Sequence, residues 1–495
     1  MRASKIPAHF EVIRSSAAAL WAQLDANEEL AAPWRQMFRQ VTQTPAHVVS
    51  ELLQNADDAG ATWARVFIEK GVFVLEHDGA DFDESDLRSL CRFGFSNKRS
   101  LLTIGFRGIG FKSTFSLGPT VFLTTRTLSL RFREEHFTLP EWNDEISPSP
   151  HVTVRVPIAD AMREASLRLN FEQWQSAPAS LLFFSSLRRV EIEKAVLEAV
   201  SLGEGPAGTQ RYELHGGGRV VDVLLARSEE ESFPADALKE VRNERDADIV
   251  LPPCRVDVVL GLPGSQRAFA VLPTEVALDT PFSVNGPFVQ TPDRERIRDP
   301  ASSATNRWLL RRAGRLAAET MLAWLSDEAR PIEERQQAYG LLPNSPGTAR
   351  SDQPEPNALI GSGFANLGSA PAVLLGVDAD LHTRPDCPAV PPVLFDVWAT
   401  DDLRSIFAQA ASTFLAPDVS HEHRTRLVAW GWLSSISKSQ VADTLSQTSP
   451  PRPSTDDALF RLWALLVSTL RGGAFTWRAR RLHVVPVIGD GRLRH

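Results

Sequence analysis

The sequence predicts an α+β protein of several domains, and three observations support this fold class. The chain has 495 residues, which is too long for one compact core. In its first third, helical patterns precede a run of short strands, an order typical of helices packed on a mostly antiparallel sheet and not of alternating βαβ units. Toward the C-terminus helical patterns dominate. We therefore expect an α/β sandwich at 1–185, an α/β middle domain at 186–340, a linker at 341–357 and a mainly helical domain at 358–495.

The expected elements of the first domain follow from apolar periodicity and turn residues. Apolar residues three and four apart predict a helix over 10–39, and a second helix follows Pro45 and runs to Ala59, with Gly60 as its stop. Lys70 and Gly71 form a hairpin turn between two strands. The expected strands are 64–68, 72–76, 121–125, 128–132 and 152–156, with a short helix at 84–92.

The later elements are predicted in the same way. The middle domain has strand patterns at 219–225, 255–260 and 268–272 and closes with a helix at 304–325. Four prolines with Ser, Gly and Asp mark 342–356 as a linker or long surface loop. Helices are expected at 402–414, 423–435 and 456–470. The ending at 482–492 has a strand and glycine-turn pattern, typical either of a truncated longer protein or of a C-terminal edge strand.

Composition excludes several protein classes. The hydrophobic fraction is 43% and the charged fraction 23%, no apolar run approaches the roughly 18 residues of a membrane span, and the first ten residues are polar and charged. Three cysteines without metal or disulfide spacing, Cys91, Cys254 and Cys387, favour a reducing compartment. We therefore expect a cytoplasmic protein without a membrane partner. The net charge of -8 does not support nucleic acid as a partner, although a local basic surface is compatible with it.

The second helix carries the first candidate site residues. A step of about 100° per residue places Glu51, Asn55 and Asp58 within about 60° of one another, with Leu52, Leu53 and Ala56 on the other side. One face therefore presents two carboxylates and a carboxamide. The alternative is the solvated face of an ordinary amphipathic helix.

The second candidate is Asp78, which ends a strand and precedes Gly79. A carboxylate at a strand end can accept a hydrogen bond from an exocyclic amine such as that of adenine, and glycine lets the backbone approach a ligand closely. An Asp-Gly pair is also a common turn. The neighbouring His77 has no Ser or Cys partner and is interpreted as a packing residue.

The third candidate is the glycine-rich segment 104–113, with Gly105, Gly108 and Gly110 before an expected helix start. Glycines there let backbone N–H groups point at phosphate oxygens. The spacing matches neither the dinucleotide fingerprint nor the P-loop. Only 7 of the 53 basic residues are lysines, so Lys98 and Lys112 beside this turn merit attention, and Lys112 could add a point charge at the phosphates.

In their order and spacing, the words "ELLQNADDA", "SNK" and "GFRGIGFKS" resemble the Bergerat nucleotide fold of the GHKL ATPases, which include gyrase, heat-shock-ninety chaperones, MutL and histidine kinases. The likeness is strongest to sacsin-type and heat-shock-ninety-like domains. It implies that Glu51 is the general base, that Asn55 binds Mg²⁺ and that Asp78 reads adenine. The implied nucleotide contacts are completed by Asp58, Lys98, Gly105, Gly108, Ile109, Gly110, Phe111 and Lys112.

The sequence departs from this family pattern at two places. The usual Asp-x-Gly-x-Gly is Asp78-Gly79-Ala80-Asp81-Phe82, so one glycine is shifted and the other is absent. The late threonine that contacts adenine matches Thr153, which no glycine precedes. Glu51, which histidine kinases of the superfamily lack, favours hydrolysis over phosphotransfer.

A second resemblance lies at 280–297, "TPFSVNGPFVQTPDRERI", which is similar to the middle-domain segment of sacsin-type and heat-shock-ninety proteins. It implies that Arg294 reaches the γ-phosphate as an arginine finger does. The alternative is a solvated loop arginine. The ending "VVPVIGDGRL" is similar to a strand and turn of sacsin-like proteins.

Together these observations predict a cytoplasmic, Mg²⁺-dependent ATPase with slow turnover, in which ATP closes a lid at 96–110 and docks Arg294. The resemblance implies an ATP-dependent homodimer and a chaperone-like role or a part in bacterial defence, with an unidentified client. The alternatives are a nucleotide-gated scaffold with little turnover and a DNA-handling subunit. A DNA-gated clamp like MutL would show DNA-stimulated turnover, and the acidic net charge disfavours it.

Overall fold

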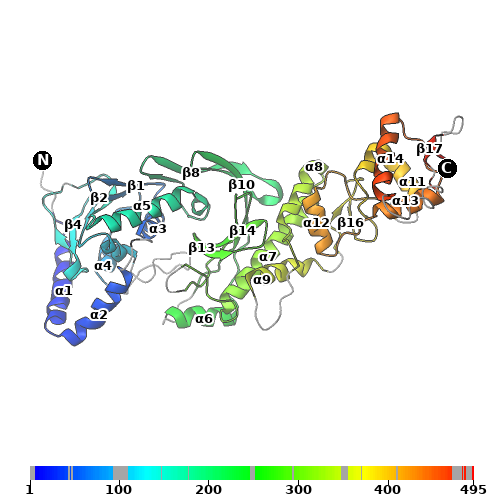
Figure 1. Ribbon diagram of the computed structural model, residues 1–495. Helices are drawn as coiled ribbons and strands as arrows, with labels where there is room; N and C mark the ends of the chain where they lie inside the picture. Colours follow the sequence, from blue (N-terminus) through cyan, green and yellow to red (C-terminus); the bar gives the residue numbers. More distant parts are fainter. Residues whose placement is uncertain are drawn as a thin grey trace. The chain divides into compact units, whose positions relative to one another are not determined.

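A computed structural model shows the protein as two compact units (Figure 1). It describes residues 6–42, 45, 48–92, 110–146, 148–176, 178–245, 251–291, 295–346, 355–368, 371–408, 411–470, 482, 484–486 and 493–494. The first unit comprises Met1–Gly205, Gln210–Ala277 and Ser283–Leu309. The second comprises Pro206–Thr209, Leu278–Phe282 and Leu310–His495.

The first unit is built on one mixed sheet of 14 strands in the order β13-β12-β14-β11-β10-β9-β8-β7-β1-β2-β6-β3-β4-β5. The pairs β1·β7 and β12·β14 are parallel, whereas β1·β2, β2·β6 and β3·β6 are antiparallel. Its strands are β1 (Trp63–Glu69), β2 (Val72–His77), β3 (Thr120–Thr124), β4 (Ser129–Arg133), β5 (Glu141–Trp142), β6 (Val152–Pro157), β7 (Arg189–Ile192), β8 (Ala195–Glu204), β9 (Gln210–Gly216), β10 (Arg219–Arg227), β11 (Asp257–Leu260), β12 (Arg267–Ala270), β13 (Leu272–Ala277) and β14 (Phe282–Asn285).

Helices cover the core face of the N-terminal part of this sheet. They are α1 (Ala8–Asp25), α2 (Glu28–Val41), α3 (Val48–Asp58), α4 (Glu84–Leu90) and α5 (Ala161–Ser176), with short 3-10 turns including η3 (Gly110–Ser116) and η5 (Pro178–Leu182). Helix α3 packs against α5 and β1 (Figure 1). Their apolar side chains form one core with those of β1, β2, β3 and β6. The predicted α+β fold is therefore confirmed.

The expected first helix is wrong in one respect, because it is two helices. The chain breaks between Asp25 and Glu28, where Asn27 adopts an extended conformation and its side chain accepts a hydrogen bond from the Glu29 N–H. Asparagine is a strong N-cap, so α2 begins anew at this point. The apolar spacing on either side does not reveal the break.

The hairpin turn is confirmed, with Lys70 and Gly71 both at positive φ, 51° and 76°. This geometry matches the twist of the flanking strands β1 and β2 and favours glycine at the second position.

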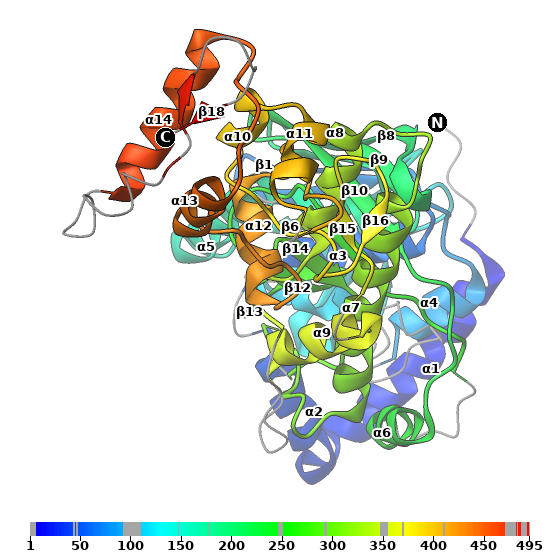
Figure 2. The same ribbon diagram turned by 90° about the vertical axis from the view of Figure 1, so that its right-hand side faces the viewer.

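The second unit is mainly helical. It contains most of α7 (Ala304–Leu325), α8 (Ile332–Arg335), α9 (Pro356–Phe364), α10 (Val393–Val397), α11 (Thr400–Ile406), α12 (His421–Ala429), α13 (Lys438–Gln447) and α14 (Asp456–Leu470). Two hairpins accompany them, β15 (Leu374–Leu375) with β16 (Leu381–His382) and β17 (Val485–Pro486) with β18 (Leu493–Arg494). Figure 2 shows β18 close to α14, where the Trp463 indole N–H donates to the Val484 carbonyl at 3.0 Å. Within the part of the chain that the structure describes, none of the helices combines the length and the apolar composition of a membrane span.

Candidate functional site

Helix α3 presents the predicted polar residues along one face. Glu51 is buried, with 7% of its surface exposed, Asn55 is half-buried and Asp58 at the helix end is exposed. Leu52, Leu53 and Ala56 on the other side lie in the core, and their burial fixes the rotation of the helix. Exposure therefore rises along this face from Glu51 toward the C-terminal end of α3.

Asp78 lies at the exit of β2 and is held there by the start of β1. Its Oδ1 accepts hydrogen bonds from the Thr62 and Trp63 N–H groups at 2.8 and 3.1 Å, and its Oδ2 accepts one from the Thr62 hydroxyl at 2.6 Å. Burial acts to raise the pKa of Asp78, but these hydrogen bonds lower it below its usual value. The carboxylate is thus ionised and oriented. Because a carboxylate offers about four acceptor positions, it retains capacity for one more donor.

Thr62 was not identified from the sequence as a site residue. It supplies two of the three hydrogen bonds to Asp78. Its place two residues after the Gly60 helix stop and immediately before β1 is the sequence feature that could have suggested an anchoring role.

Gly79 serves packing in this structure. A Cβ at this position would lie 2.9 Å from His77 Nδ1 and 3.0 Å from both the Cβ and the carbonyl oxygen of Ala59. The adjacent Ala80 N–H donates to the Ala59 carbonyl at 2.8 Å. The absence of a side chain therefore brings the end of β2 against the end of α3, which links the carboxylate strand to the polar helix.

His77 is a buried packing residue, as the sequence indicated. Its Nδ1 accepts a hydrogen bond from the Gly79 N–H at 3.1 Å. Burial lowers its pKa to about 4, so the ring is neutral at physiological pH. It therefore braces the turn that carries Asp78.

Asp57, which was not identified from the sequence, anchors the C-terminal end of α3. Its carboxylate accepts hydrogen bonds from the N–H groups of Ser185, Ser186 and Leu187 at 2.9, 2.7 and 2.9 Å. Because this carboxylate accepts from three successive backbone N–H groups, it fixes the end of α3 to the loop before β7.

Thr153 does not join this group. In β6 it pairs with Glu76 of β2, and side chains of paired residues share a sheet face. Glu76 and Arg155 form an ion pair at 3.7 Å on that face, whereas Val152 and Val154 point into the core on which α3 packs. The alternation of β6 therefore directs Thr153 away from Glu51 and Asn55, and its contact with adenine stays a prediction.

The segment after the glycine turn is described from Gly110 onward and forms η3, which packs against α3. Phe111 is buried beside the Phe132 ring, with centroids 5.5 Å apart. Lys98, Gly105, Gly108 and Ile109 lie outside the described residues.

Lys112 is buried in the core, with 1% of its surface exposed. Its ammonium donates to the Leu90 carbonyl at 2.6 Å and lies 5.2 Å from the ring centroids of both Phe111 and Phe132. Burial lowers the pKa of this lysine to about 8. In this conformation the Lys112 ammonium lies in the core, and its contact with a phosphate stays a prediction.

The segment predicted to carry the arginine finger has a well-defined base, although Arg294 itself lies outside the described residues. The Thr291 N–H donates to the Arg296 carbonyl at 2.9 Å, and the Arg298 N–H donates to the Val289 carbonyl at 2.7 Å. The two sides of the segment are therefore paired, and residues 292–294 connect them.

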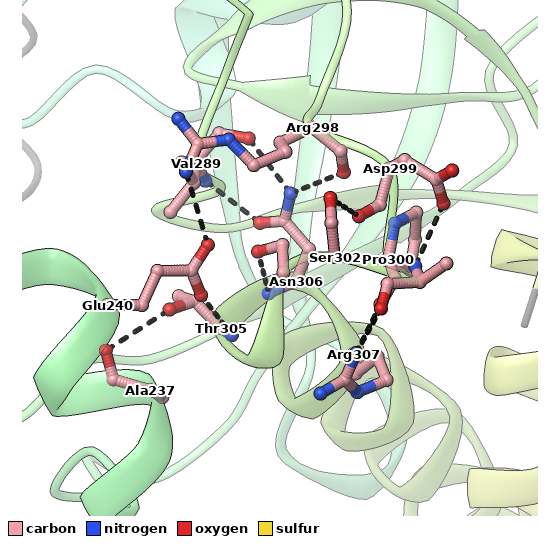
Figure 3. A network of polar contacts seen from close by, with 12 residues as sticks. Ala237, Glu240, Val289, Arg298, Asp299, Pro300, Ser302, Thr305, Asn306 and Arg307 are labelled. Carbon is pink, nitrogen blue, oxygen red and sulfur yellow. Dashed lines mark hydrogen bonds and ion pairs between the residues drawn. The ribbon is translucent and has the colours of Figure 1, made fainter. Parts of the chain in front are cut away.

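Asn306, at the start of α7, clamps this base (Figure 3). Its Oδ1 accepts from the Val289 N–H, and its Nδ2 donates to the carbonyls of Val289 and Arg298, each at 2.8 Å. Beside it, Glu240 accepts from the Thr305 N–H at 2.9 Å and pairs with Arg298 at 3.5 Å. This fully buried amide ties both sides of the segment to α7.

Comparisons with known proteins give partial matches. The chain is 35% identical over 130 residues to the DNA mismatch repair protein MutL of Chlorobium phaeobacteroides (strain BS1), covering 23% of this chain and 21% of that protein. It is 36% identical over 97 residues to the Protein MICRORCHIDIA 3 of Arabidopsis thaliana, covering 18% and 16%, and 36% over 98 residues to the MutL of Shewanella pealeana, covering 18% and 15%. No family model matches the chain.

The chain thus spans about a fifth or less of the length of these relatives. MutL is one of the GHKL proteins named above, so the matches support a relationship to that superfamily. The likeness to sacsin-type and heat-shock-ninety-like proteins stays a prediction.

Proposed function

We propose that this protein binds ATP with Mg²⁺ at the site formed by α3 and the end of β2, and that it hydrolyses ATP slowly. The observation that carries this proposal is the ionised Asp78 carboxylate, which Thr62 holds at the strand exit with an acceptor position to spare. The partial similarity to MutL adds support, since GHKL proteins are ATPases.

Each residue has a role that its chemistry allows. Asp78 would accept the adenine amino group, and Gly105, Gly108 and Gly110 would supply backbone donors to the phosphates. Glu51, buried at the N-terminal end of the α3 polar face, would take the proton of the attacking water.

The α3 face also suits a magnesium ion. The Asn55 side-chain oxygen is the kind of sparse protein ligand that Mg²⁺ accepts beside phosphate oxygens and water, and Asp58 lies one turn further on. When bound, Mg²⁺ would offset the negative charge that develops on the phosphates. Arg294 is proposed to add charge from the segment that Asn306 clamps.

Direct binding and turnover measurements test the proposal. We expect wild-type protein to bind ATP with Mg²⁺, and Glu51→Gln to retain binding while turnover falls by about a hundredfold or more, as expected when general-base catalysis is lost. The matched control is Glu69→Gln, which replaces an exposed glutamate at the end of β1. Equal turnover of Glu51→Gln and wild type would remove Glu51 from catalysis.

The second candidate function is a nucleotide-gated scaffold or DNA-handling subunit, which the matches to a DNA mismatch repair protein favour. Binding of ATP that Asp78→Asn abolishes, together with undetectable wild-type turnover, would select this alternative. Duplex DNA added to the same assay separates a DNA-gated enzyme, whose turnover it would stimulate, from a sacsin-type or chaperone-like one. The domain boundaries proposed from the sequence, an ATP-dependent homodimer and a role in bacterial defence belong to the same proposal.

A further inference from the structure

The β15–β16 hairpin of the second unit carries a group of metal-ligating side chains. Asp378 and Asp380 lie in the turn between the two strands, and His382 lies in β16. One oxygen of each carboxylate and one nitrogen of the imidazole lie within 4.8 Å of one another. The Asp378 and His382 side chains are 26% and 21% exposed, so water and ions can reach them. These three residues are called the hairpin site below.

The spacing of Asp378 and His382 is that of two ligands on one ion. His382 Nε2 lies 2.9 Å from Asp378 Oδ1. Two ligand atoms that are each about 2.0–2.2 Å from an ion, nearly at right angles, lie roughly 3 Å apart. An ion can therefore replace the hydrogen bond between these two side chains without separating them. A rotation of the exposed Asp380 side chain would bring the third ligand to the same ion.

Gly376 allows the two side chains to lie so close together. A Cβ at this position would collide with Asp378 Oδ1 and would lie 2.8 and 2.9 Å from Cδ2 and Nε2 of His382. Any side chain here would therefore displace both ligand atoms. The adjacent Val377 N–H donates to the Phe414 carbonyl at 3.0 Å, which ties the turn to a neighbouring segment of the same unit.

The buried Thr413 hydroxyl faces the hairpin site from that neighbouring segment. Gly376 and Leu415 form an antiparallel bridge, so Thr413 lies opposite Asp378, two residues further along. Burial acts to raise the pKa of Asp378, but the neighbouring His382 and Thr413 side chains lower it below its usual value. Thr413 is 2% exposed, and its hydroxyl makes no hydrogen bond of normal geometry among the described residues. Such an unsatisfied hydroxyl is costly, so the contact of Asp378 with His382 leaves this part of the hairpin incomplete.

Arg404 of α11 approaches the other oxygen of Asp378. Its Nη2 lies 3.7 Å from Oδ2, and its buried Nε also lacks a hydrogen-bond partner in the part of the chain that the structure describes. Thr413 and Arg404 thus place donors around Asp378 while its Oδ1 faces His382. Carboxylates that bind metal ions are held by outer contacts of this kind. The positive charge of Arg404 offsets part of the attraction of the two aspartates for a cation, so we expect moderate affinity.

We infer that Asp378, Asp380 and His382 bind a divalent transition-metal ion of the Zn²⁺ type, through two carboxylate oxygens and one imidazole nitrogen. The imidazole favours such an ion over Mg²⁺ and Ca²⁺, which take oxygen ligands. On binding, Asp378 Oδ1 turns from His382 to the ion, and Thr413 donates to the same carboxylate. Three protein ligands leave a coordination position for water or an external ligand.

Isothermal titration with ZnCl₂ tests the hairpin site. The full chain is used without nucleotide, after a chelator has removed any bound metal. We expect one Zn²⁺ to bind in the micromolar range and a large excess of Mg²⁺ not to compete. His382→Ala and Asp378→Asn should each weaken Zn²⁺ binding at least about tenfold, because even outer contacts of a metal site contribute that much. Gly376→Ala keeps all three ligands but should weaken binding too, since its Cβ displaces two of them.

The matched control is His421→Ala, which replaces an exposed histidine at the start of α12 in the same unit. It should leave the affinity for Zn²⁺ unchanged. Circular dichroism of the metal-free variants separates loss of a ligand from loss of the fold, and His382→Ala, at a partly exposed position, decides if another variant does not fold. Visible absorbance of bound Co²⁺ should be lost in His382→Ala. The inference is overturned if wild-type protein binds no Zn²⁺, or if His382→Ala binds it as tightly as the wild type.

The hairpin site and the proposed ATP site can fail separately. The hairpin site lies in the second unit and shares no residue with α3 or the end of β2. Wild-type protein that binds no ATP refutes the proposed function and leaves the titration with Zn²⁺ valid. Conversely, Asp78→Asn should keep the wild-type affinity for Zn²⁺, and a loss of that affinity would place the ion at the ATP site and overturn the inference.

Discussion

Replacing Asp78 by asparagine removes the negative charge at the end of β2 and keeps the size of the side chain. The Asn side-chain oxygen can still accept from the N–H groups of Thr62 and Trp63, which lie 2.8 and 3.1 Å from the present Oδ1. The new amide group can donate to the Thr62 hydroxyl, which now donates to Oδ2 at 2.6 Å. The local fold should survive with a loss of about 1 kcal/mol or less in the free energy of unfolding.

Nucleotide binding should respond much more strongly. The adenine amino group would lose a hydrogen bond to a charged acceptor, which contributes about 1.5–3 kcal/mol, and would face an N–H donor instead. We therefore expect ATP to bind roughly 10- to 150-fold more weakly. Thr62→Val, which removes only the hydroxyl donor, should weaken ATP binding by about 1 kcal/mol, roughly fivefold.

Equilibrium titration with ATP and Mg²⁺ measures these affinities, and urea unfolding measures stability. The control is Asp222→Asn, an exposed carboxylate of β10 that faces neither α3 nor the end of β2. An Asp78→Asn variant that binds ATP within twofold of the wild type would refute adenine recognition by this residue. A similar loss of affinity in Asp222→Asn would show that the effect is not local.

Three further predictions concern buried groups. As the pH falls from 6.5 to 4, the wild type should lose about 3 kcal/mol of unfolding free energy relative to His77→Gln. The pKa of His77 is lowered to about 4 in the folded protein, so the unfolded state binds the proton first. A difference between the two proteins that does not change with pH would contradict this. As the pH rises from 8 to 10.5, the wild type should gain about 3 kcal/mol of unfolding free energy relative to Lys112→Met. Burial lowers the pKa of Lys112 to about 8, so the lysine becomes a neutral amine at a lower pH in the folded protein than in the unfolded chain. Urea titrations at both ends of the pH range measure this gain, and parallel pH profiles of the two proteins would rule it out. Asn306→Ala should lower the unfolding free energy by about 3 kcal/mol, because it leaves the Val289 N–H and the Arg298 carbonyl unpaired and removes one of the two hydrogen bonds to the Val289 carbonyl. Ser302→Ala, at an exposed neighbouring position, should not reproduce this loss.

Much of the local structure was predictable because its causes are local. The helices at Ala304–Leu325 and Asp456–Leu470 have the bounds that apolar periodicity predicts. The β1–β2 hairpin follows from Lys70 and Gly71, and the rotation of α3 follows from its apolar residues. These features depend on residues a few positions apart, whose spacing the sequence shows directly.

The surroundings of other side chains depend on distant partners. The sequence does not show that Phe132 and the Leu90 carbonyl contact Lys112 in the core. It also does not show that the pairing of β6 with β2 places Thr153 on the face of Glu76. A shift of one residue in a strand reverses the face of a side chain, and only the pairing register determines which face is buried.

By itself, the sequence determined the α+β class, the polar face of Glu51 and Asn55 on α3, and the position of Asp78 at the end of a strand, because each depends on local periodicity and turn chemistry. The tertiary structure alone decided that Thr62 anchors Asp78, that Asn306 clamps the base of a segment before α7, and that Thr413 lies opposite Asp378. These contacts join residues that are far apart along the chain or on separate elements. The packing of the elements determines which of these residues come into contact. The spacing of residues within one element does not show how that element packs against the others.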